Sequence, residues 1–588
     1  MKFNQIKTRY DLARLLELPQ SYLTYVLYVA DFDSFYNSFD ISKKYGGVRK
    51  IFAPNSQLKV IQQRLAKQLC IYQAEKDSGL NISHAFQKNK DIFSNSRIHR
   101  HKKFVLNMDI KDFFDSIHYG RVRGFFMKNK DFLFPNDIAS MVAHLVCYHG
   151  HLPQGAPSSP VITNLITRIL DFRILKITNK YKVTYTRYAD DLTFSTNDKH
   201  FLEDSNKFIN SISDELNKSG FTVNTSKTRL RFHGSRQEVT GLVVNQKVNT
   251  PREFYKLTRA MAYSLYKNNE FFIDDKVSSV RQLEGRFSFI NQISQKNNKI
   301  HNNPSHIKTT REEEYRKFLI YKYFFGNDLP TIITEGKTDS HYLKAALKNL
   351  YKEYPTLIEK VSDNKFNFKI HFFNRTPRID YFLGIRIDGG DSMKNIVDYY
   401  QYSYESIHLE HKKGEKIPRK TRHTQHSKHK QGENTPKYVQ YFKDLSKRDP
   451  LNPVILIFDN EINTKNKKPL RSFINKLSFT KSDRDKLKIS CKCHIIDNLY
   501  LVTTPLNSTS QNPALRNIES EIEDLFDPET LHHEINGKDF SRKDNDPANF
   551  YGKEAFSKYI IQNYEKIDFS KFRPLLNNIV ETINDYSK

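Results

Sequence analysis

Residues 185–194 read Tyr-Thr-Arg-Tyr-Ala-Asp-Asp-Leu-Thr-Phe, a pattern that predicts two short strands joined by a tight turn. Asp190 and Asp191 lie in this turn, and Asp109 lies at the end of an apolar strand predicted at 104–110. If these strands are neighbours in one sheet, three carboxylates meet at its edge. Two aspartates in a turn are weak evidence alone, because Asp favours turns. Three carboxylates, however, suit the two divalent cations, about 3.5–4 Å apart, that nucleotide addition to a 3′ end requires.

Three further motifs flank this turn, and all four follow one another within about residues 40–250. The set comprises Asn-Met-Asp-Ile-Lys-Asp-Phe-Phe (107–114), Leu-Pro-Gln-Gly-Ala-Pro-Ser-Ser-Pro (152–160), Tyr-Ala-Asp-Asp (188–191) and the spaced residues Gly220, Phe221, Asn224, Lys227 and Thr228. In this order the motifs resemble those of the reverse transcriptases. The resemblance implies an α+β right-hand fold of fingers, palm and thumb, and an RNA-directed DNA polymerase activity.

The same resemblance assigns roles to individual residues. The implied ligands of a two-metal Mg²⁺ site are Asp109, Asp190, Asp191 and the Ile110 carbonyl. Gln154 and Gly155 would shape the nucleotide pocket, and Lys227 would donate a proton to pyrophosphate. Arg49 would contact the triphosphate, with a surface arginine of the fingers as the alternative. Phe114 occupies the position of the family's aromatic gate, where a bulky ring would collide with a ribose 2′-hydroxyl and favour deoxynucleotides.

Two smaller segments resemble marks of the retron reverse transcriptases. Asn95-Ser96-Arg97-Ile98-His99 precedes the first acidic motif and is similar to an Asn-Ala-x-x-His segment, with Ser96 in place of Ala. Val239-Thr240-Gly241 follows the last motif. Each mark is weak alone, and their positions around the polymerase motifs make the match. Both segments are predicted to take part in RNA binding, through Asn95, His99, Val239, Thr240 and Gly241.

Resemblance to retrons implies a particular chemistry. The enzyme would bind a structured noncoding RNA encoded beside it and start DNA from a guanosine 2′-hydroxyl, using dNTPs and leaving a branched RNA–DNA hybrid (msDNA). RNA removal would fall to a host RNase H. The basic residues Arg252, Lys256 and Arg259 of the next helical region would grip backbone phosphates, with a solvated helix face as the alternative.

A second set of acidic residues occurs in the C-terminal half. Glu335-Gly336-Lys337-Thr338-Asp339 follows an apolar strand, Asp459 and Glu461 follow another, and Gly336 permits a sharp turn. The arrangement resembles a Toprim domain, which implies an α/β fold with Mg²⁺ or Mn²⁺ held by Glu335, Asp459 and Glu461. Glu461 stands where the family has Asp, which lengthens the arm. The intervening turn of the family is matched only weakly, by Gly389-Gly390 after Ile387-Asp388.

A retron polymerase joined to a Toprim domain resembles the fused retrons of bacterial antiphage defence, of the retron Ec67 type. That resemblance implies a nuclease held in check by the hybrid and released by infection. The main alternative is a group II intron-like or other mobile-element reverse transcriptase whose C-terminal module binds nucleic acid without catalysis. A homo-oligomer, the trigger and the nuclease target (DNA, messenger RNA or transfer RNA) stay open.

Composition and charge fit a nucleic-acid partner. The chain has 588 residues with 94 Lys and Arg against 66 Asp and Glu, a net charge of +28. Such an excess favours polyanions, because each neutralised phosphate releases condensed counterions. No apolar run approaches the roughly 18 residues of a membrane span, and the N-terminus lacks the apolar core of a signal peptide, so we expect a cytoplasmic protein with no membrane partner. Four cysteines exclude a disulfide framework.

The pattern of apolar residues and breakers divides the chain into segments. Predicted strands lie at 47–54, 104–110, 183–196, 330–334 and 454–458, and predicted helices lie at 1–30, 56–75, 203–218, 253–296 and 340–351. The predicted domains are fingers and palm (1–250), thumb (251–310), linker (311–329), Toprim-like domain (330–505) with a basic insertion (408–437), and a C-terminal helical extension (506–588).

Overall fold

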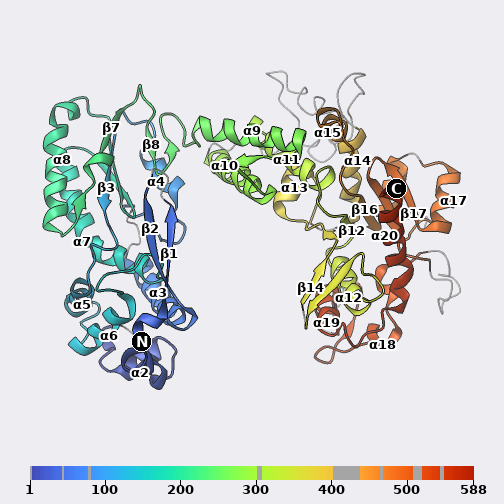
Figure 1. The fold of residues 1–588 in the computed structure, drawn as a ribbon, viewed down its shortest axis with the longest axis horizontal. Helices are drawn as coiled ribbons and strands as arrows, with labels where there is room; N and C mark the ends of the chain where they lie inside the picture. Colours follow the sequence, from blue (N-terminus) through green and yellow to red (C-terminus); the bar gives the residue numbers. More distant parts are fainter. Residues whose placement is uncertain are drawn as a thin grey trace. The chain divides into compact units, whose positions relative to one another are not determined.

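The computed structural model of the chain (Figure 1) describes residues 3–42, 46–76, 81–300, 308–363, 365–387, 389–401, 438–463, 468–477, 479–506, 519–542 and 549–587. It divides into two compact units. The first unit is Met1–Tyr255 with Ile293–Asn303, and the second unit is Lys256–Gln292 with Pro304–Lys588. None of the described helices combines the length and the apolar character that crossing a membrane requires.

The first unit opens with helices that surround a two-stranded hairpin. Its elements up to the main sheet are α1 (Arg9–Leu15), α2 (Gln20–Tyr28), β1 (Tyr36–Ser42), β2 (Val48–Pro54), α3 (Ser56–Lys76) and α4 (Ile92–Ile98). The hairpin is antiparallel, with Tyr36 opposite Pro54 and Ser42 opposite Val48. The predicted strand at 47–54 and helix at 56–75 are confirmed. Asp91 begins α4, because its side chain accepts a hydrogen bond from the Ser94 amide in a capping box.

An antiparallel sheet forms the centre of the first unit. Its strands are β3 (Phe104–Lys111), β4 (Thr184–Tyr188), β5 (Asp191–Thr196), β6 (Thr222–Val223) and β7 (Arg229–Phe232), in the order β4-β5-β3-β6, with β7 also paired to β3. The predicted strands at 104–110 and 183–196 are confirmed. Helices α5 (Tyr119–Lys128), α6 (Asn136–Val146), α7 (Ser159–Lys180) and α8 (Phe201–Lys218) add further residues to the same core.

Alternate residues of β3 face two different layers, as the period of a strand requires. Leu106 and Met108 join the large core together with Ile174 of α7 and Phe208 of α8. Val105 points the other way and packs against a second, smaller hairpin, β8 (Glu238–Val239) with β9 (Leu242–Val243). The sheet therefore lies between the α7 and α8 helices on one side and the segment around residues 237–244 on the other (Figure 1).

The region predicted as one helical stretch at 253–296 consists of two helices around a short hairpin. These are α9 (Arg252–Asn268), β10 (Phe272–Ile273), β11 (Lys276–Val277) and α10 (Val280–Ile300). The predicted linker at 311–329 differs from the structure, because most of it is α11 (Thr310–Phe324), a buried helix. Within the second unit α11 packs against Leu265 of α9 and Phe287 of α10. Three of its charged side chains are buried, those of Glu312, Glu313 and Lys317. Glu312, for example, accepts a hydrogen bond of 2.9 Å from the Tyr381 hydroxyl.

The second unit contains a five-stranded sheet in the order β15-β12-β16-β18-β17. The strands are β12 (Thr331–Thr334), β15 (His371–Phe372), β16 (Val454–Phe458), β17 (Lys492–Ile496) and β18 (Leu499–Thr503), and only β17 runs antiparallel to its neighbour. The predicted strands at 330–334 and 454–458 are confirmed, as is the predicted helix that follows the first, α12 (Asp339–Asn349). Ile333 and Leu456 face one hydrophobic layer, whereas Ile332 and Ile455 face another.

The other elements of this unit are β13 (Ile358–Ser362), β14 (Lys365–Phe368), α13 (Pro377–Leu383), α14 (Ile396–Gln401), α15 (Tyr438–Ser446), α16 (Pro469–Lys476), α17 (Lys481–Ser490), α18 (Pro528–Leu531), β19 (Asp539–Phe540), β20 (Phe550–Tyr551), α19 (Lys553–Gln562) and α20 (Arg573–Tyr586). The predicted C-terminal extension differs from the structure, because α19 and α20 cover one face of the sheet and complete its core. The predicted basic insertion at 408–437 lies outside the described residues.

Candidate functional sites

The strand register of the first unit brings the predicted carboxylates together. Asp109 of β3 lies directly opposite Asp191 of β5. Tyr188 pairs with Asp191 to close the β4–β5 hairpin, and Ala189 takes a positive φ of 55° in the turn. The Ile110 amide donates a 3.0 Å hydrogen bond to the Asp190 carbonyl, which fixes the turn to β3. Two strands that are far apart in the sequence therefore present three carboxylates at one sheet edge.

Lys227 is the cation that the structure places at this edge. Its Nζ donates to both carboxylate oxygens of Asp109, at 3.1 and 2.9 Å. Burial, with repulsion from Asp109, raises the pKa of Asp190, and Lys227 and Arg49 oppose that shift. Burial and repulsion from Asp190 and Asp109 raise the pKa of Asp191 to about 7. Asp191 keeps an exposed surface, so repulsion from Asp190 and Asp109 is the part of this shift that supports a cation site.

The side chains at this edge can be compared with the ligands that a metal ion prefers. Among the described residues, no group of three or more His, Cys, Asp or Glu side chains is arranged to hold a metal ion as it stands. The donor set nevertheless suits Mg²⁺, because it consists of carboxylate oxygens with more negative charge than Lys227 neutralises. An ammonium already occupies Asp109, which shows that this edge attracts a cation.

The loop at 152–160 contacts the β1–β2 hairpin through its backbone. The Phe52 amide of β2 donates a 2.9 Å hydrogen bond to the Gln154 carbonyl. Gly155 has φ +119°, and a Cβ there would lie 2.7 Å from the Phe52 carbonyl oxygen. Only glycine fits both the backbone angle and the contact. Phe114 follows β3 closely in the sequence, and its side chain is half-buried. The centre of its ring lies 5.7 Å from that of Phe113 and 6.5 Å from that of Phe86.

A buried ion pair between β4 and α7 supports the β4–β5 hairpin, and it was not predicted from the sequence. The Arg187 guanidinium is fully buried and makes two hydrogen bonds, of 2.9 and 2.8 Å, to the Asp171 carboxylate of α7. It also donates a 3.2 Å bond to the Ala189 carbonyl in the turn. Removing one partner of such a pair leaves a buried charge, at a cost of about 3–5 kcal/mol. The available signal was weak: one arginine in the short strand before the turn and the one acidic residue in a long helix.

Several residues predicted to bind RNA are enclosed in the protein. Asn95 and His99 of α4 are 0% exposed, and Val239 of β8 is 1% exposed. A side chain without solvent contact does not reach an RNA in this structure, so direct RNA contact is corrected for these three. Thr240 is half-buried, and Gly241 is exposed in the turn of the β8–β9 hairpin. Both turn residues have positive φ, 46° and 78°.

The basic residues predicted to grip phosphates lie on α9 and are exposed. Arg252, Lys256 and Arg259 follow the helical spacing that places them along one stripe of the helix. Arg259 also forms a 3.5 Å ion pair with Glu314 of α11. The exposure of this stripe is compatible with both alternatives predicted from the sequence, contact with phosphates and a solvated helix face.

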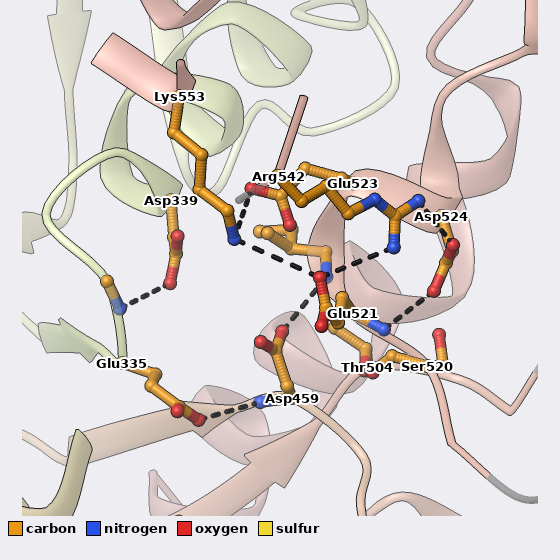
Figure 2. Close-up of polar contacts among 12 residues, drawn as sticks. Glu335, Asp339, Asp459, Thr504, Ser520, Glu521, Glu523, Asp524, Arg542 and Lys553 are labelled. Carbon is orange, nitrogen blue, oxygen red and sulfur yellow. Dashed lines mark hydrogen bonds and ion pairs between the residues drawn. The ribbon is translucent and has the colours of Figure 1, made fainter. Parts of the chain in front are cut away.

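A second acidic cluster lies at the carboxyl ends of two parallel strands of the second unit (Figure 2). Glu335 follows β12, Asp339 begins α12 and Asp459 follows β16. The Asp459 amide donates a 3.3 Å hydrogen bond to Glu335 Oε2, and the Gly336 amide donates a 2.6 Å bond to Asp339 Oδ2. A Cβ on Gly336 would lie 2.6 Å from the Asp339 carboxylate, so a larger residue here would displace that carboxylate.

The predicted ligand Glu461 is already engaged by a lysine. Its side chain is 4% exposed, and its Oε1 forms a 2.7 Å ion pair with Lys468. Its charge is nevertheless the first like-charge neighbour that raises the pKa of Glu335. Glu461 therefore lies close enough to act on the cluster, with its charge partly neutralised.

Three further residues of the cluster, Glu521, Glu523 and Lys553, come from the C-terminal region 506–588, for which the sequence predicts no function. Glu521 and Glu523 lie beside Lys553, whose Nζ is 2.9 Å from Glu523 and 3.9 Å from Glu521 (Figure 2). The Ile522 amide donates a 2.9 Å hydrogen bond to Asp459 Oδ1, which ties this segment to β16. The signal was an acidic run, Glu-Ser-Glu-Ile-Glu-Asp at 519–524, far from the other motifs.

Burial and crowding of like charges make this cluster a fit for a divalent cation. Burial, then repulsion from Glu461 and Asp339, raises the pKa of Glu335 to about 8. Burial also raises the pKa of Asp339, and burial with repulsion from Asp339 and Glu335 raises the pKa of Asp459 well above its ordinary range. Carboxylates held together against repulsion are the donor set that Mg²⁺ or Mn²⁺ prefers.

A pH-dependent response to metal is expected from this cluster. Because the pKa of Glu335 is raised to about 8, the folded chain holds a proton that the unfolded chain releases above about pH 4.3. Stability without metal should therefore fall as pH rises from about 4 to 8. Binding of Mg²⁺ or Mn²⁺ needs the ionised carboxylate, so added metal should raise the melting temperature little at pH 6 and more at pH 8.5.

Differential scanning fluorimetry of the wild type and Glu335→Gln, each with and without MnCl₂, measures this response. The rise in melting temperature caused by metal should grow less with pH in Glu335→Gln than in the wild type. The rise caused by metal bound to the first unit should be the same in both proteins. Equal metal responses of the two proteins at every pH would contradict a role for Glu335 in metal binding.

Comparison with known proteins matches the first part of the chain. The family described as reverse transcriptase (RNA-dependent DNA polymerase) matches residues 41–255. The chain is 32% identical to the retron Ec86 reverse transcriptase of Escherichia coli over 49% of its own length and 86% of that protein. It is 30% identical to the retron Mx65 and Mx162 reverse transcriptases of Myxococcus xanthus, covering 44% and 47% of this chain and 61% and 62% of those proteins.

Proposed function

Because the chain belongs to the family of retron reverse transcriptases, we propose that it copies a dedicated noncoding RNA into a branched RNA–DNA hybrid. The family membership gives RNA-directed DNA polymerase activity. The finer proposal adds priming from a guanosine 2′-hydroxyl of the RNA and a second, nuclease activity in the second unit. The observation that carries the polymerase part is the register of β3 and β5, which sets Asp109 opposite Asp191 beside the Asp190 turn.

The proposed chemistry divides between bound metal and the chain's own groups. Asp109, Asp190 and Asp191, with the Ile110 carbonyl, would hold Mg²⁺, which when bound supplies activation of the attacking hydroxyl and neutralisation of the leaving pyrophosphate. Lys227, which in this structure donates to Asp109, would donate its proton to the pyrophosphate. Its pKa is raised, first by the hydrogen bond to Asp109, so it carries that proton at neutral pH.

The incoming dNTP would lie against the surface that the β1–β2 hairpin and the Gln154-Gly155 loop form together. The charge of Arg49 of β2 partly opposes the rise in the pKa of Asp190, so it acts on the same edge and suits a triphosphate. Gln154 and Gly155 would form the floor of the pocket, because the loop is joined to β2 by the Phe52 hydrogen bond. A pocket built from two segments in backbone contact holds its shape.

The Phe114 ring is proposed to exclude ribonucleotides. Phe114→Ala is expected to reduce the preference for dNTP over rNTP by at least about tenfold, equivalent to about 1.4 kcal/mol of discrimination, because the collision with the 2′-hydroxyl is removed. Primer extension with each nucleotide type gives the ratio of kcat/KM values. The matched control is Phe86→Ala, which removes the neighbouring, more exposed ring. Unchanged discrimination in Phe114→Ala would show that the gate assignment is wrong.

The RNA-binding proposal now centres on exposed groups. The turn at Thr240-Gly241 would touch an RNA stem-loop, and Arg252, Lys256 and Arg259 would contact its phosphates. Host RNase H would then remove the copied RNA.

Self-priming separates this proposal from a mobile-element polymerase. The purified protein is incubated with the structured RNA transcribed beside its gene, Mg²⁺ and one labelled dNTP. Label that migrates with the RNA under denaturing conditions, and that is released by a 2′–5′ debranching enzyme, is the expected result. A mobile-element enzyme would extend only an annealed primer and leave the RNA unlabelled, which would overturn the retron part of the proposal.

For the second unit we propose a Toprim-like nuclease that acts as an effector in antiphage defence. The supporting observation is the convergence of Glu335, Asp339 and Asp459 at the carboxyl ends of β12 and β16. Mg²⁺ or Mn²⁺ held there would supply an activated water for phosphodiester hydrolysis. Lys553, placed beside Glu521 and Glu523, is positioned at the same site to offset negative charge of a phosphate.

One observation favours a second candidate, a module that binds nucleic acid without cutting it. Glu461 and Glu523 are already paired with Lys468 and Lys553, as in a structural network of ion pairs. A binding module would keep the RNA–DNA hybrid bound after Asp459→Asn and show the same nuclease background as the wild type. A nuclease would lose cleavage in that variant.

A further inference from the structure

A chain of hydrogen bonds joins α4 to both strands of the catalytic hairpin. His99 Nδ1 lies 2.7 Å from the Ser195 hydroxyl of β5, and His99 Nε2 lies 2.7 Å from the Thr186 hydroxyl of β4. The Thr186 hydroxyl in turn donates a 2.5 Å bond to Asn95 Oδ1. We call Asn95, His99, Thr186 and Ser195 the α4 brace. All four side chains are at most 2% exposed.

The brace needs a neutral imidazole. Burial lowers the pKa of His99 to about 3, so the ring holds a single proton at neutral pH. One ring nitrogen then donates and the other accepts, and two hydroxyls that can each donate and accept complete the chain. Each of these three hydrogen bonds thus has one donor and one acceptor without any water or charge, which gives α4, β4 and β5 a fixed relative position.

The place of the brace relative to the catalytic turn is specific. Thr186 lies four residues before Asp190 along β4, and Ser195 lies four residues after Asp191 along β5. Because Thr186 pairs with Thr193 and Ser195 pairs with Thr184, the imidazole links the two strands diagonally, two residue pairs apart along the hairpin. The other support of the hairpin, Arg187 with Asp171, acts from α7, so the hairpin is fixed from two independent elements.

The same part of α4 is also joined to the β8–β9 hairpin, through Ser96, the neighbour of Asn95. The Ser96 hydroxyl donates a 2.8 Å bond to the Val239 carbonyl and lies 3.2 Å from the Thr240 hydroxyl. The Asn107 side chain of β3 donates a 2.9 Å bond to the Glu238 carbonyl. The two segments at 95–99 and 239–241 are therefore packed on each other as well as on the polymerase sheet.

We propose that Asn95, His99 and Thr186 are positioning residues for DNA synthesis, which hold the turn carrying Asp190 and Asp191 in register with Asp109. The inference rests on the proposed polymerase function and replaces an RNA contact by a structural link to the catalytic carboxylates. A displacement of reacting groups by about 1 Å can cost roughly a hundredfold in rate. Loss of one brace bond should therefore lower kcat and leave the binding of substrates unchanged.

Thr186→Val tests the proposal, because it removes one hydroxyl and keeps the shape of the side chain. Primer extension on an annealed RNA template should show kcat lower by roughly ten- to a hundredfold, with KM for dNTP and Kd for RNA within about twofold of the wild type. Thr186→Ser restores the hydroxyl and should recover most of kcat. Ser195→Ala repeats the test from the other strand if Thr186→Val does not fold.

The alternatives give different results. Weaker RNA binding, with kcat restored at saturating RNA, would overturn the proposal in favour of RNA recognition. A lower melting temperature with unchanged kcat well below that temperature would overturn it in favour of a purely structural role. A wild type without DNA synthesis on the primed template would overturn the polymerase function itself, and with it this inference.

Discussion

Asp190→Asn is expected to reduce DNA synthesis at least about a thousandfold, because a metal ligand at the reacting centre stabilises the transition state by several kcal/mol. The asparagine keeps the size of the side chain and loses the charge that binds the cation. The measurement is single-turnover primer extension with saturating dNTP, together with the melting temperature of the variant without metal.

Stability should move in the opposite direction from activity. The pKa of Asp190 is raised by burial and by repulsion from Asp109, so its ionised form is disfavoured in the folded chain. Removing that charge should leave the melting temperature at pH 8 equal or higher. Asp214→Asn, on the exposed face of α8, is the matched control and should change neither quantity. Residual synthesis within tenfold of the wild type, or a clear loss of stability, would contradict the assignment of Asp190.

Glu335→Gln is expected to remove antiphage protection while the DNA product is made at the wild-type level. The effect should be complete, because Glu335 is the carboxylate that faces Glu461, Asp339 and the Asp459 amide at once. Plaque counts on bacteria expressing the variant measure protection, and gel analysis of extracted nucleic acid measures the DNA product. Protection should fall to that of cells without the gene.

The matched control for this experiment is Glu581→Gln on α20, an exposed glutamate whose ion pair with Lys492 lies outside the acidic cluster. It should retain both protection and DNA product. Full protection by Glu335→Gln, with the DNA product present, would show that the nuclease hypothesis is wrong. Loss of both outputs would point to a folding defect, which the melting temperature of the variant detects.

The sequence predicted well those elements whose apolar pattern is local. The strands β3, β5 and β16 bury nearly every residue, and continuous apolar runs of this kind are visible in short windows of sequence. The turn at Asp190 and the loop at Gly155 follow from residue types that the backbone demands. The pairing of Asp109 with Asp191 could be expected only on the assumption that β3 and β5 are neighbours, and the register supplies that link.

The predictions that differ from the structure involve polar residues placed inside. The Asn95 side chain accepts a hydrogen bond from Thr186, and the His99 ring is hydrogen-bonded to Thr186 and Ser195. Nothing in the local sequence distinguishes Asn95 and His99 from surface residues. The segment that forms α11 is rich in charged residues, and this composition favoured the prediction of a linker. In the structure Glu312 and Lys317 are buried beside aromatic side chains. Burial of a charge depends on a partner distant in sequence, which a single sequence does not reveal.

The second acidic cluster was predicted in part for the same reason. Glu335 and Asp459 follow apolar strands, and that local context made them visible. Glu521, Glu523 and Lys553 come from the C-terminal segment. The hydrogen bond from the Ile522 amide to Asp459, more than 60 residues away in the chain, joins that segment to the cluster. Their segment contains no apolar strand that would have marked them.

The nucleic acid that copurifies with the wild-type protein from cells tests the central claim most directly. After protease treatment, the retained nucleic acid is sequenced with and without a debranching enzyme. Retron synthesis predicts one RNA species joined through a guanosine 2′-oxygen to one DNA species, absent from the Asp190→Asn protein, which keeps the RNA alone. Recovery of RNA and DNA with no covalent link between them would contradict the account.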